Sequence, residues 1–382
     1  MKKIYIVLSL LMTSFSVSSQ NMDGPPRGGQ YGFTQLLING WGKSSGMGNS
    51  YSAGVSGVES FYLNIAGLGR IASTDIAFSR TSWLGGTGIN INTFGFGQKV
   101  GEDGVIGISV MSFALGQIPI TTFDQPDGGI GTYRPSISNV NLAYAYNFSE
   151  RISAGLNVKI ASESTPDVRV GAMAFDAGLQ YADQFVRGKK SQVKYQNPEN
   201  NPAAARGSDI RFGVSIKNLG TDVRYTGDGL AAKSRIDGKS YEQTTSQRSD
   251  KTALPSQINI GLAYDFRLDK DSNSYWHRLT PAITFTNNVA MYNQTSLGVE
   301  YAYKELLLLR AGYNYEKGVF NYETRNNAYT GLNVGTSIQI PMSKKDSNGT
   351  RLNNSRFGID YSYRFTRPFS GTHTFGIRVA LD

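Results

Sequence analysis

The chain has 382 residues, among them 44 glycines, 22 tyrosines, 19 phenylalanines and no cysteine, and its formal net charge is +9. Average usage would give roughly 27 glycines at this length, so glycine is in excess. The lack of cysteine excludes disulfides, thiol catalysis, iron–sulfur clusters and lipid attachment at an N-terminal cysteine. Only His277 and His373 remain for metal or triad chemistry. Most enzyme classes are therefore disfavoured, and no catalytic residue, metal or cofactor is expected.

The N-terminus has the pattern of a secretory signal peptide. Lys2 and Lys3 precede a short apolar run, residues 4–12, and small residues at 17–19 offer a cleavage site before Gln20. The apolar run is too short to cross a ~30 Å hydrocarbon core as a helix, which argues against a membrane anchor. We expect residues 1–19 to be removed and the protein to be exported, with a formal charge of 9 − 2 = +7.

Residues 20–74 are rich in glycine and serine and show no regular alternation. The spacing of Gly46 and Gly48 resembles part of a dinucleotide motif, but no strand pattern precedes it and no helical run follows it. Residues 42–44 read Gly-Lys-Ser without the upstream glycine of a phosphate-binding loop. Neither stretch predicts a nucleotide site, and no nucleic-acid partner is expected.

From about residue 75 to the C-terminus, apolar residues recur at every second position, which is the period of a β-strand. In one such segment, Leu156 and Ile160 fall on one face and Asn157 and Lys159 on the other. About 14 strands are predicted, near residues 75–84, 88–98, 104–115, 139–148, 152–161, 173–181, 210–217, 258–266, 278–287, 297–303, 307–315, 332–340, 357–365 and 373–381.

An even number of strands, most of them roughly 9–12 residues long, is typical of a single-chain outer-membrane barrel. A soluble β-sandwich has shorter strands and packs its apolar faces against one another. Here the second face carries charges, which a dry sandwich core would bury at high cost and a wet lumen accepts. We therefore predict an all-β fold: residues 75–382 form a transmembrane antiparallel β-barrel, with apolar side chains toward lipid and a polar, glycine-rich lumen.

Two tight turns test the strand register. If residues 149–151 and 304–306 are three-residue turns, the apolar residues stay on one side of the wall, which pairs Phe148 with Ile152, Tyr144 with Leu156, Tyr303 with Leu307 and Val299 with Ala311. Glu300 then lies opposite Arg310 on the lumen side. We predict an ion pair there that fixes the register rather than marking a substrate path.

The turns also suggest an orientation. With both termini in the periplasm, the two tight turns are periplasmic, where barrel turns are short. The long connections 116–136 and 219–253 are then extracellular. The long basic segment 182–208 is periplasmic, against the usual rule, and is either a solvated loop, which we favour, or a docking element, unless one strand is miscounted. Aromatic residues near strand ends would form the two interfacial girdles, namely Phe148, Tyr181, Phe266, Tyr303, Tyr315 and Phe365.

A barrel of 14 strands is wide enough to need filling, so residues 20–74 are predicted to lie in the lumen as a plug. Residues 269–273 have the spacing that begins a calcium loop, but Ser274 and Thr280 stand where such a loop needs glycine and glutamate. No metal site is predicted there. A phospholipase-like site is not proposed either, because His277 and His373 lie in a short connection and at a strand start.

Several segments carry a family resemblance. Gly46, Met47 and Gly48 begin a Gly-Met-Gly-Asn-Ser-Tyr run. A second run reads Asn-Ile-Ala-Gly-Leu and consists of Asn64, Ile65, Ala66, Gly67 and Leu68. Further segments lie at residues 214–220, 254–256, 298–301 and 309–313. Together they resemble the PorV/PorQ family of Bacteroidota outer-membrane proteins, itself similar to FadL-type fatty-acid transport barrels. Ile65 stands where that family typically has proline.

The resemblance implies a barrel in the outer membrane of a Bacteroidota-like Gram-negative cell, with N-terminal elements in its lumen and a role in type IX secretion. Family members accompany the large translocon, or pass cargo with a C-terminal signal domain to an attachment complex. The chain could equally attend another machine, such as the barrel-assembly complex. Expected partners are therefore a larger outer-membrane complex, secreted cargo domains, and lipid or lipopolysaccharide.

Three hypotheses follow. The first is a non-enzymatic accessory barrel that binds an export or assembly complex through its loops and outer wall. The second is a FadL-type transporter of small hydrophobic compounds, which needs an apolar pocket and an opening in the wall, whereas the predicted lumen is polar. The third is a passive pore, which the N-terminal segment should obstruct.

Overall fold

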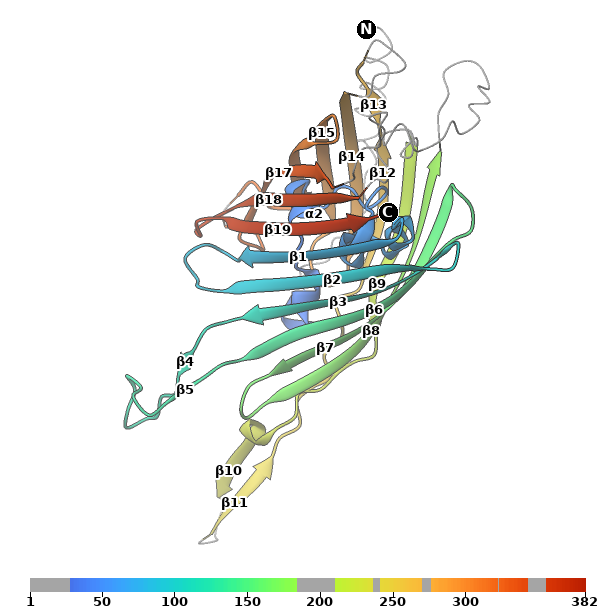
Figure 1. The fold of residues 1–382 in the computed structure, drawn as a ribbon. Helices are drawn as coiled ribbons and strands as arrows, with labels where there is room; N and C mark the ends of the chain where they lie inside the picture. The colour runs from blue at the N-terminus through green and yellow to red at the C-terminus, as the bar shows by residue number, and fades with distance from the viewer. Residues whose placement is uncertain (1–27, 184–209, 236–240, 270–275, 322, 343–354) are drawn as a thin grey trace.

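The computed structural model of the protein describes residues 28–183, 210–235, 241–269, 276–321, 323–342 and 355–382. The predicted signal peptide, residues 1–19, and nearly all of the basic connection 182–208 lie outside the described residues. The described part consists mainly of β-strands, and they form one large antiparallel sheet that closes on itself (Figure 1). The predicted all-β barrel is confirmed.

The sheet has 15 hydrogen-bonded strands, and the short β13 (Phe266–Arg267) continues β12 past Asp265, which leaves a wall of 14 strands. β1 pairs with β19, and β12 pairs with both β9 and β14, so the ring is complete. The wall strands are β1 (Thr74–Ser82), β2 (Asn90–Val100), β3 (Gly104–Ala114), β6 (Ser136–Asn147), β7 (Ile152–Ser164), β8 (Arg169–Asp183), β9 (Ile210–Gly220), β12 (Gln257–Tyr264), β14 (His277–Asn288), β15 (Gln294–Tyr303), β16 (Leu307–Glu316), β17 (Tyr329–Pro341), β18 (Arg356–Thr366) and β19 (Thr372–Leu381).

Two hairpins extend from one end of the barrel (Figure 1). β4 (Ile118–Pro119) pairs with β5 (Thr132–Tyr133), and β10 (Ala231–Arg235), which follows the 3-10 helix η8 (Asp228–Leu230), pairs with β11 (Glu242–Ser246). We call this end the hairpin end, and the opposite end, where β19 finishes, the turn end. That the hairpin end faces the cell exterior stays a prediction.

The registers of the two tight hairpins agree with the sequence pattern. Tyr144 lies opposite Leu156, and the Phe148 amide donates to the Ile152 carbonyl at 3.0 Å. In the second hairpin the predicted pairs of β15 and β16 are also present, Tyr303 with Leu307 and Val299 with Ala311. Both register predictions are confirmed, and they hold because each turn keeps the apolar side chains on one face of the wall.

The outer face of the wall is apolar. Leu142, Leu156 and Phe175, on three neighbouring strands, are 51%, 66% and 51% exposed, whereas their lumen-side neighbours Asn141 and Asn157 are buried. The same contrast recurs around the ring, with exposed apolar side chains on all 14 wall strands. An apolar outer band on a closed barrel matches the hydrocarbon core of a bilayer. The barrel therefore spans a membrane.

Residues 28–73, which we call the plug, lie inside the barrel. They form short helical turns separated by extended chain: η2 (Gly28–Gln30), η3 (Thr34–Leu37), α2 (Gly42–Gly46), η4 (Gly57–Glu59), α3 (Ser60–Leu63) and η5 (Ile65–Arg70). Among the described residues, no helix is long and apolar enough to span a membrane. η5 packs against β6, β7 and β8, whereas α2 packs against β17, β18 and β19. Because these strands lie on different arcs of the ring, the plug crosses the lumen.

Glycines on the lumen face let the plug lie directly on the wall. At all of them except Gly107 a Cβ atom would come closer than 3.0 Å to a plug atom, a distance that real Cβ contacts essentially never show, and at Gly107 the distance would be 3.0 Å. We call this set the glycine belt: it comprises Gly95 and Gly97 of β2, Gly107 of β3, Gly155 of β7, Gly178 of β8, Gly213 of β9, Gly261 of β12, Gly298 of β15, Gly312 of β16 and Gly335 of β17.

Much of the belt consists of glycines that face each other across adjacent strands, such as Gly155 with Gly178 and Gly298 with Gly312. Several contacts are from backbone to backbone: a Cβ at Gly335 would lie 2.8 Å from the Gly46 Cα atom. Backbone cannot retreat into another rotamer, so larger residues at these positions would displace the plug.

We predict that Gly335→Ala destabilises the folded barrel by about 1–3 kcal/mol, since the added methyl group overpacks the contact with Gly46. Gly358→Ala is the matched control on the next strand, because its Cβ would have no neighbour nearer than 3.8 Å. Urea unfolding in phospholipid vesicles, followed by tryptophan fluorescence, measures both variants. Equal stability of the two would contradict close packing of the plug.

Candidate functional site: the plugged lumen

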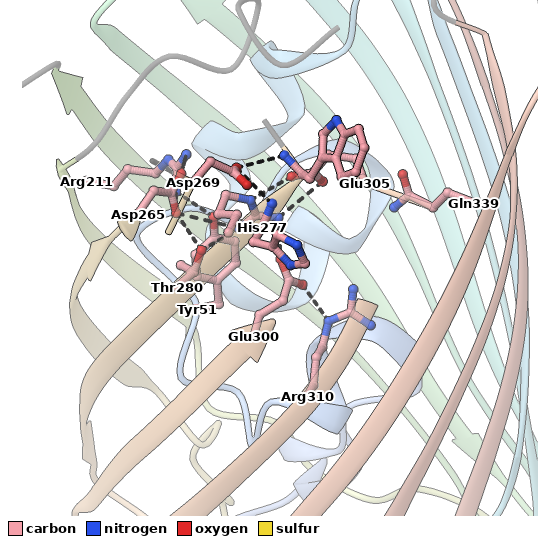
Figure 2. Close-up of polar contacts among 12 residues, drawn as sticks. Tyr51, Arg211, Asp265, Asp269, His277, Thr280, Glu300, Glu305, Arg310 and Gln339 are labelled. Carbon is pink, nitrogen blue, oxygen red and sulfur yellow. Dashed lines mark hydrogen bonds and ion pairs between the residues drawn. The ribbon is translucent and has the colours of Figure 1, made fainter. Parts of the chain in front are cut away.

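Charged side chains form a continuous row along the lumen wall near the turn end (Figure 2). An Arg211 Nη2 lies 2.5 Å from Asp265 Oδ2, and Arg278 reaches the other oxygen of Asp265 at 3.6 Å. Arg278 Nη2 lies 2.8 Å from Glu300 Oε1, and Arg310 Nε lies 2.6 Å from Glu300 Oε2. We call these five residues the charge belt. Positive and negative groups alternate in it, so each buried charge has an opposite neighbour.

The predicted partners Glu300 and Arg310 are direct cross-strand neighbours, and their side chains are only 6% and 1% exposed. The carboxylate of Glu300 is shared, because Arg278 binds its second oxygen. Arg278 also contacts Glu305 at 2.7 Å. The contact is thus one link in a network over several strands, and its role in fixing the register stays a prediction.

The network continues through hydroxyl groups toward the C-terminal strands. Arg310 Nη1 donates to Ser337 Oγ at 2.6 Å, and Ser337 in turn donates to the Asp360 carboxylate. Arg278 donates to Thr280, which donates to Asp265 at 2.6 Å. These hydroxyls give buried and partly buried charged groups additional hydrogen-bond partners.

A cavity separates the charge belt from the plug. Its lining includes Lys43, Tyr51 and Glu59 of the plug and Glu300 and Arg310 of the wall, and its volume is about 10 Å³, room for about one water molecule. Burial lowers the pKa of Lys43 to about 8. Burial also raises the pKa of Glu59, although a neighbouring arginine acts in the opposite direction.

The first family motif lies where the plug meets β15–β17. Gly46 touches the backbone of Gly335, and the main chain of Met47 and Gly48 covers Gly312. Gly48 has a φ of +63°, a backbone angle that residues other than glycine rarely adopt. This motif therefore consists of residues that permit a backbone turn against the wall.

The second motif is tied to the opposite arc. Asn64 Nδ2 donates to carbonyl oxygens of β8 and β9 at 3.1 and 3.3 Å, and its Oδ1 accepts from the Ala66 amide at 3.2 Å. Ala66 and Leu68 are fully buried, and Gly67 lies against a plug carbonyl where a Cβ would overlap. Ile65, at the position of the family's proline, begins η5 and is 2% exposed. A functional role of either motif beyond these contacts stays a prediction.

The lumen is not polar throughout, which corrects the sequence prediction. Near the hairpin end, Phe33 and Leu36 of the plug pack on Ala161, Val170 and other small apolar residues of the β7–β8 lumen face. Ile91, Met111 and Phe113 form a second buried apolar cluster on β2 and β3. We call these two clusters the apolar vestibule.

The polarity of β2 and β3 reverses along their length. Close to the hairpin end the outer residues Asn92 and Ser112 are polar, while Ile91, Met111 and Phe113 point inward. This reversal is expected where a wall strand leaves the lipid, because the outer face then meets water. Alternation of apolar and polar residues in the sequence distinguishes the two faces of a strand. It does not show where along the strand the membrane ends.

The remaining sites weighed from the sequence have structural partners. The Asp269 carboxylate accepts hydrogen bonds from the Trp276 and His277 amides at 2.8 and 3.0 Å (Figure 2). The rest of the calcium-like run, residues 270–273, lies outside the described residues. His277 and His373 each share a hydrogen bond with a tyrosine hydroxyl, at 2.6 and 3.0 Å. Within the described ranges no cluster of metal-ligating side chains occurs.

The sequence prediction did not include Asp265 and Arg278, although the register of β14 against β15 indicates their positions. Thr280 pairs with Glu300, which puts Arg278 diagonally across from the predicted pair, and Asp265 lies next in the row. The glycine belt was visible only as an excess of glycine, since its meaning depends on what the lumen contains.

No protein-family model matches the chain, and no curated protein matches it. Among solved structures, the chain is similar to the Pseudomonas putida toluene transporter TodX, with 11% identity, a TM-score of 0.48 and coverage of 90% of this chain and 97% of that one. It is also similar to a KdgM porin, with 7% identity, a TM-score of 0.30 and coverage of 81% and 99%. The β-barrel fold of the chain is shown by its own strand pairing, and its placement in the outer membrane stays a prediction. Similarities this weak carry no argument about substrate or partner, and they leave membership of the PorV/PorQ family untested.

We predict that Glu300→Gln destabilises the barrel by about 3–5 kcal/mol, because it leaves the buried guanidinium group of Arg310 and the partly buried one of Arg278 without their shared carboxylate. Arg151→Gln is the control at a surface ion pair, where the arginine side chain is 64% exposed, and it should cost at most about 1 kcal/mol. Equilibrium unfolding of both variants in vesicles measures the difference. Similar losses in the two variants would show that the charge belt contributes no more than a surface pair.

The pH dependence of stability offers a second test. Because the pKa of Lys43 is lowered from 10.5 to about 8 in the folded barrel, the unfolded chain binds one proton more between these values, and stability rises with pH there. Lys43→Met should remove this rise, whereas Lys251→Met, at an exposed lysine, should leave it in place. Unfolding free energies at pH 8 and pH 10 measure the slope. An unchanged slope in Lys43→Met would contradict the burial of Lys43.

Proposed function

We propose that the protein is a closed, non-enzymatic outer-membrane barrel that serves as a partner subunit of a larger outer-membrane complex. The observation that carries the proposal is the filled lumen: the plug lies on the glycine belt, and the cavity beside the charge belt has a volume of about 10 Å³. Among the described residues, the space beside the charge belt is too small for a solute, so we assign the function to the outer surfaces of the barrel.

The hairpin end supplies surfaces suited to protein contact. β4–β5 and β10–β11 project beyond the wall (Figure 1). On the first of these hairpins Phe123 is fully exposed, and Ile118, Ile120 and Ile130 are between 36% and 48% exposed. Apolar side chains grouped outside the lipid band are typical of interaction sites. The resemblance to PorV and PorQ supports a type IX translocon or its cargo as the partner, and the barrel-assembly complex is the alternative.

A second candidate function rests on the apolar vestibule. FadL-type transport of small hydrophobic compounds requires apolar lumen surface near the cell exterior, and Phe33 and Leu36 cover such a surface. In this function the plug would have to move away from the wall during each passage.

A disulfide between plug and wall separates the two functions, since the chain has no native cysteine. Ser45 Oγ and Ser362 Oγ lie 2.8 Å apart and both residues are buried, so Ser45→Cys/Ser362→Cys should form a bond with ordinary geometry. We expect the locked barrel to purify from outer membranes with the same partner proteins as the wild type. We also expect it to give no stepwise conductance in planar bilayers, locked or reduced.

Thr81→Cys/Thr374→Cys is the matched control, because it links two wall strands, across 2.9 Å between hydroxyl oxygens, and leaves the plug free. Toluene uptake into cells that carry each variant tests the second function. Uptake that depends on the barrel, stops in the plug-locked variant and returns with a reductant would support transport and overturn the subunit proposal.

A further inference from the structure

The ring closes where the first wall strand meets the last. β1 and β19 share nine paired positions, from Thr74 opposite Leu381 to Ser82 opposite His373. On the lumen side of this seam Arg378 Nε of β19 lies 3.6 Å from Asp75 Oδ1 of β1. Both side chains are largely buried, with 14% and 5% of their surface exposed. The seam therefore contains an ion pair between strands that are far apart in sequence.

The plug adds a third charge to this pair. Glu59 Oε1 of η4 lies 3.3 Å from Arg378 Nη2, and its side chain is 4% exposed. The preceding Val58 amide donates to Asp75 Oδ2 at 2.9 Å. Gly57 has a φ of +77°, and a Cβ there would overlap the Asp75 carboxylate. Residues 57–59 thus bind both strands of the seam at once.

The plug also joins the two sides through its own fold. η4 packs on β1 and β2, while α2 packs on β17, β18 and β19. The Ser44 amide of α2 donates to Glu59 Oε2 at 2.8 Å, and Ser45 Oγ is 2.8 Å from Ser362 Oγ of β18. One continuous piece of plug therefore straddles the seam and is bonded on either side.

The geometry disfavours a plug that enters a finished barrel. The plug runs from Phe33, near the hairpin end, to Arg70, near the turn end. There the Arg70 guanidinium donates to the carbonyls of Glu150 and Arg151 in a tight turn. Along this path it touches the glycine belt on nine strands at close range. Residue 73 continues directly into β1, so the plug is attached to one edge of the seam.

We propose that the plug is the template on which the barrel closes, and that Glu59 makes pairing of β1 with β19 depend on the plug being seated. A buried charge without an opposite partner is strongly unfavourable. Arg378 reaches its full set of carboxylates only when plug, β1 and β19 are all in place. The inference concerns assembly and is independent of the partner or transport role.

The seam variant Thr81→Cys/Thr374→Cys reports closure, and the plug variant Ser45→Cys/Ser362→Cys reports plug seating. Each full-length chain is refolded from urea into phospholipid vesicles, and disulfide formation is sampled over time by acid quenching. We expect the plug disulfide to form before the seam disulfide. A seam that closes first would overturn the proposal, and this comparison needs no change at Glu59.

The role of Glu59 is tested by adding Glu59→Gln to the seam variant. The control is Asp176→Asn, which removes a buried carboxylate paired with Lys159 at 2.8 Å within the wall and away from the seam. We expect seam closure to slow by about tenfold or more in Glu59→Gln, the effect of a loss of about 1.4 kcal/mol in the closing step, and to slow less in Asp176→Asn. Equal rates in the two variants would assign Glu59 no part in closure.

Discussion

The contact between the backbone of the plug and the backbone of the wall determines the rest of this structure. A lumen enclosed by 14 strands is too wide for side chains of the wall to fill. The chain fills it with its own residues 28–73, and the glycine belt brings the two main chains together. Side chains at those positions would hold the plug away from the wall and admit water. The belt therefore decides how closely the plug packs on the wall.

Closure in turn explains the chemistry of the charge belt. In an open pore, lumen charges are solvated and need no fixed partners. Here the plug and the wall leave these side chains little exposed, so Arg211, Arg278 and Arg310 each lie beside a carboxylate, with Asp265 and Glu300 between them. The alternating order also constrains register, since a slip of one residue would turn every charge toward lipid. Plug, charges and strand pairing are thus parts of one arrangement.

The sequence was sufficient for the wall and insufficient for the contents of the lumen. The alternation of apolar and polar residues predicted the strands and both tight hairpins. It does so because one face of each strand meets lipid and the other meets the lumen, which gives the sequence a period of two. Asn64 shows what alternation cannot give: its amide binds carbonyls of two wall strands that are more than 100 residues away. Ile91, Met111 and Phe113 show a second limit, since the same alternation continues where β2 and β3 leave the membrane and their polarity reverses.

The apolar vestibule favours transport of small hydrophobic compounds, whereas the filled lumen favours a partner subunit. The two features involve different depths of the plug. Phe33 and Leu36 meet the wall through apolar contacts near the hairpin end. Deeper in the barrel the plug is held by a further apolar cluster around Trp41 and Phe61, by the glycine belt, by hydrogen bonds such as Ser45 to Ser362, and by the ion pair of Glu59 with Arg378. Apolar side chains on a short segment can leave their site at modest cost, whereas a buried charge cannot lose its partner cheaply. The second candidate function would therefore begin with movement of the segment around Phe33 and Leu36, while Glu59 and Arg378 stay paired.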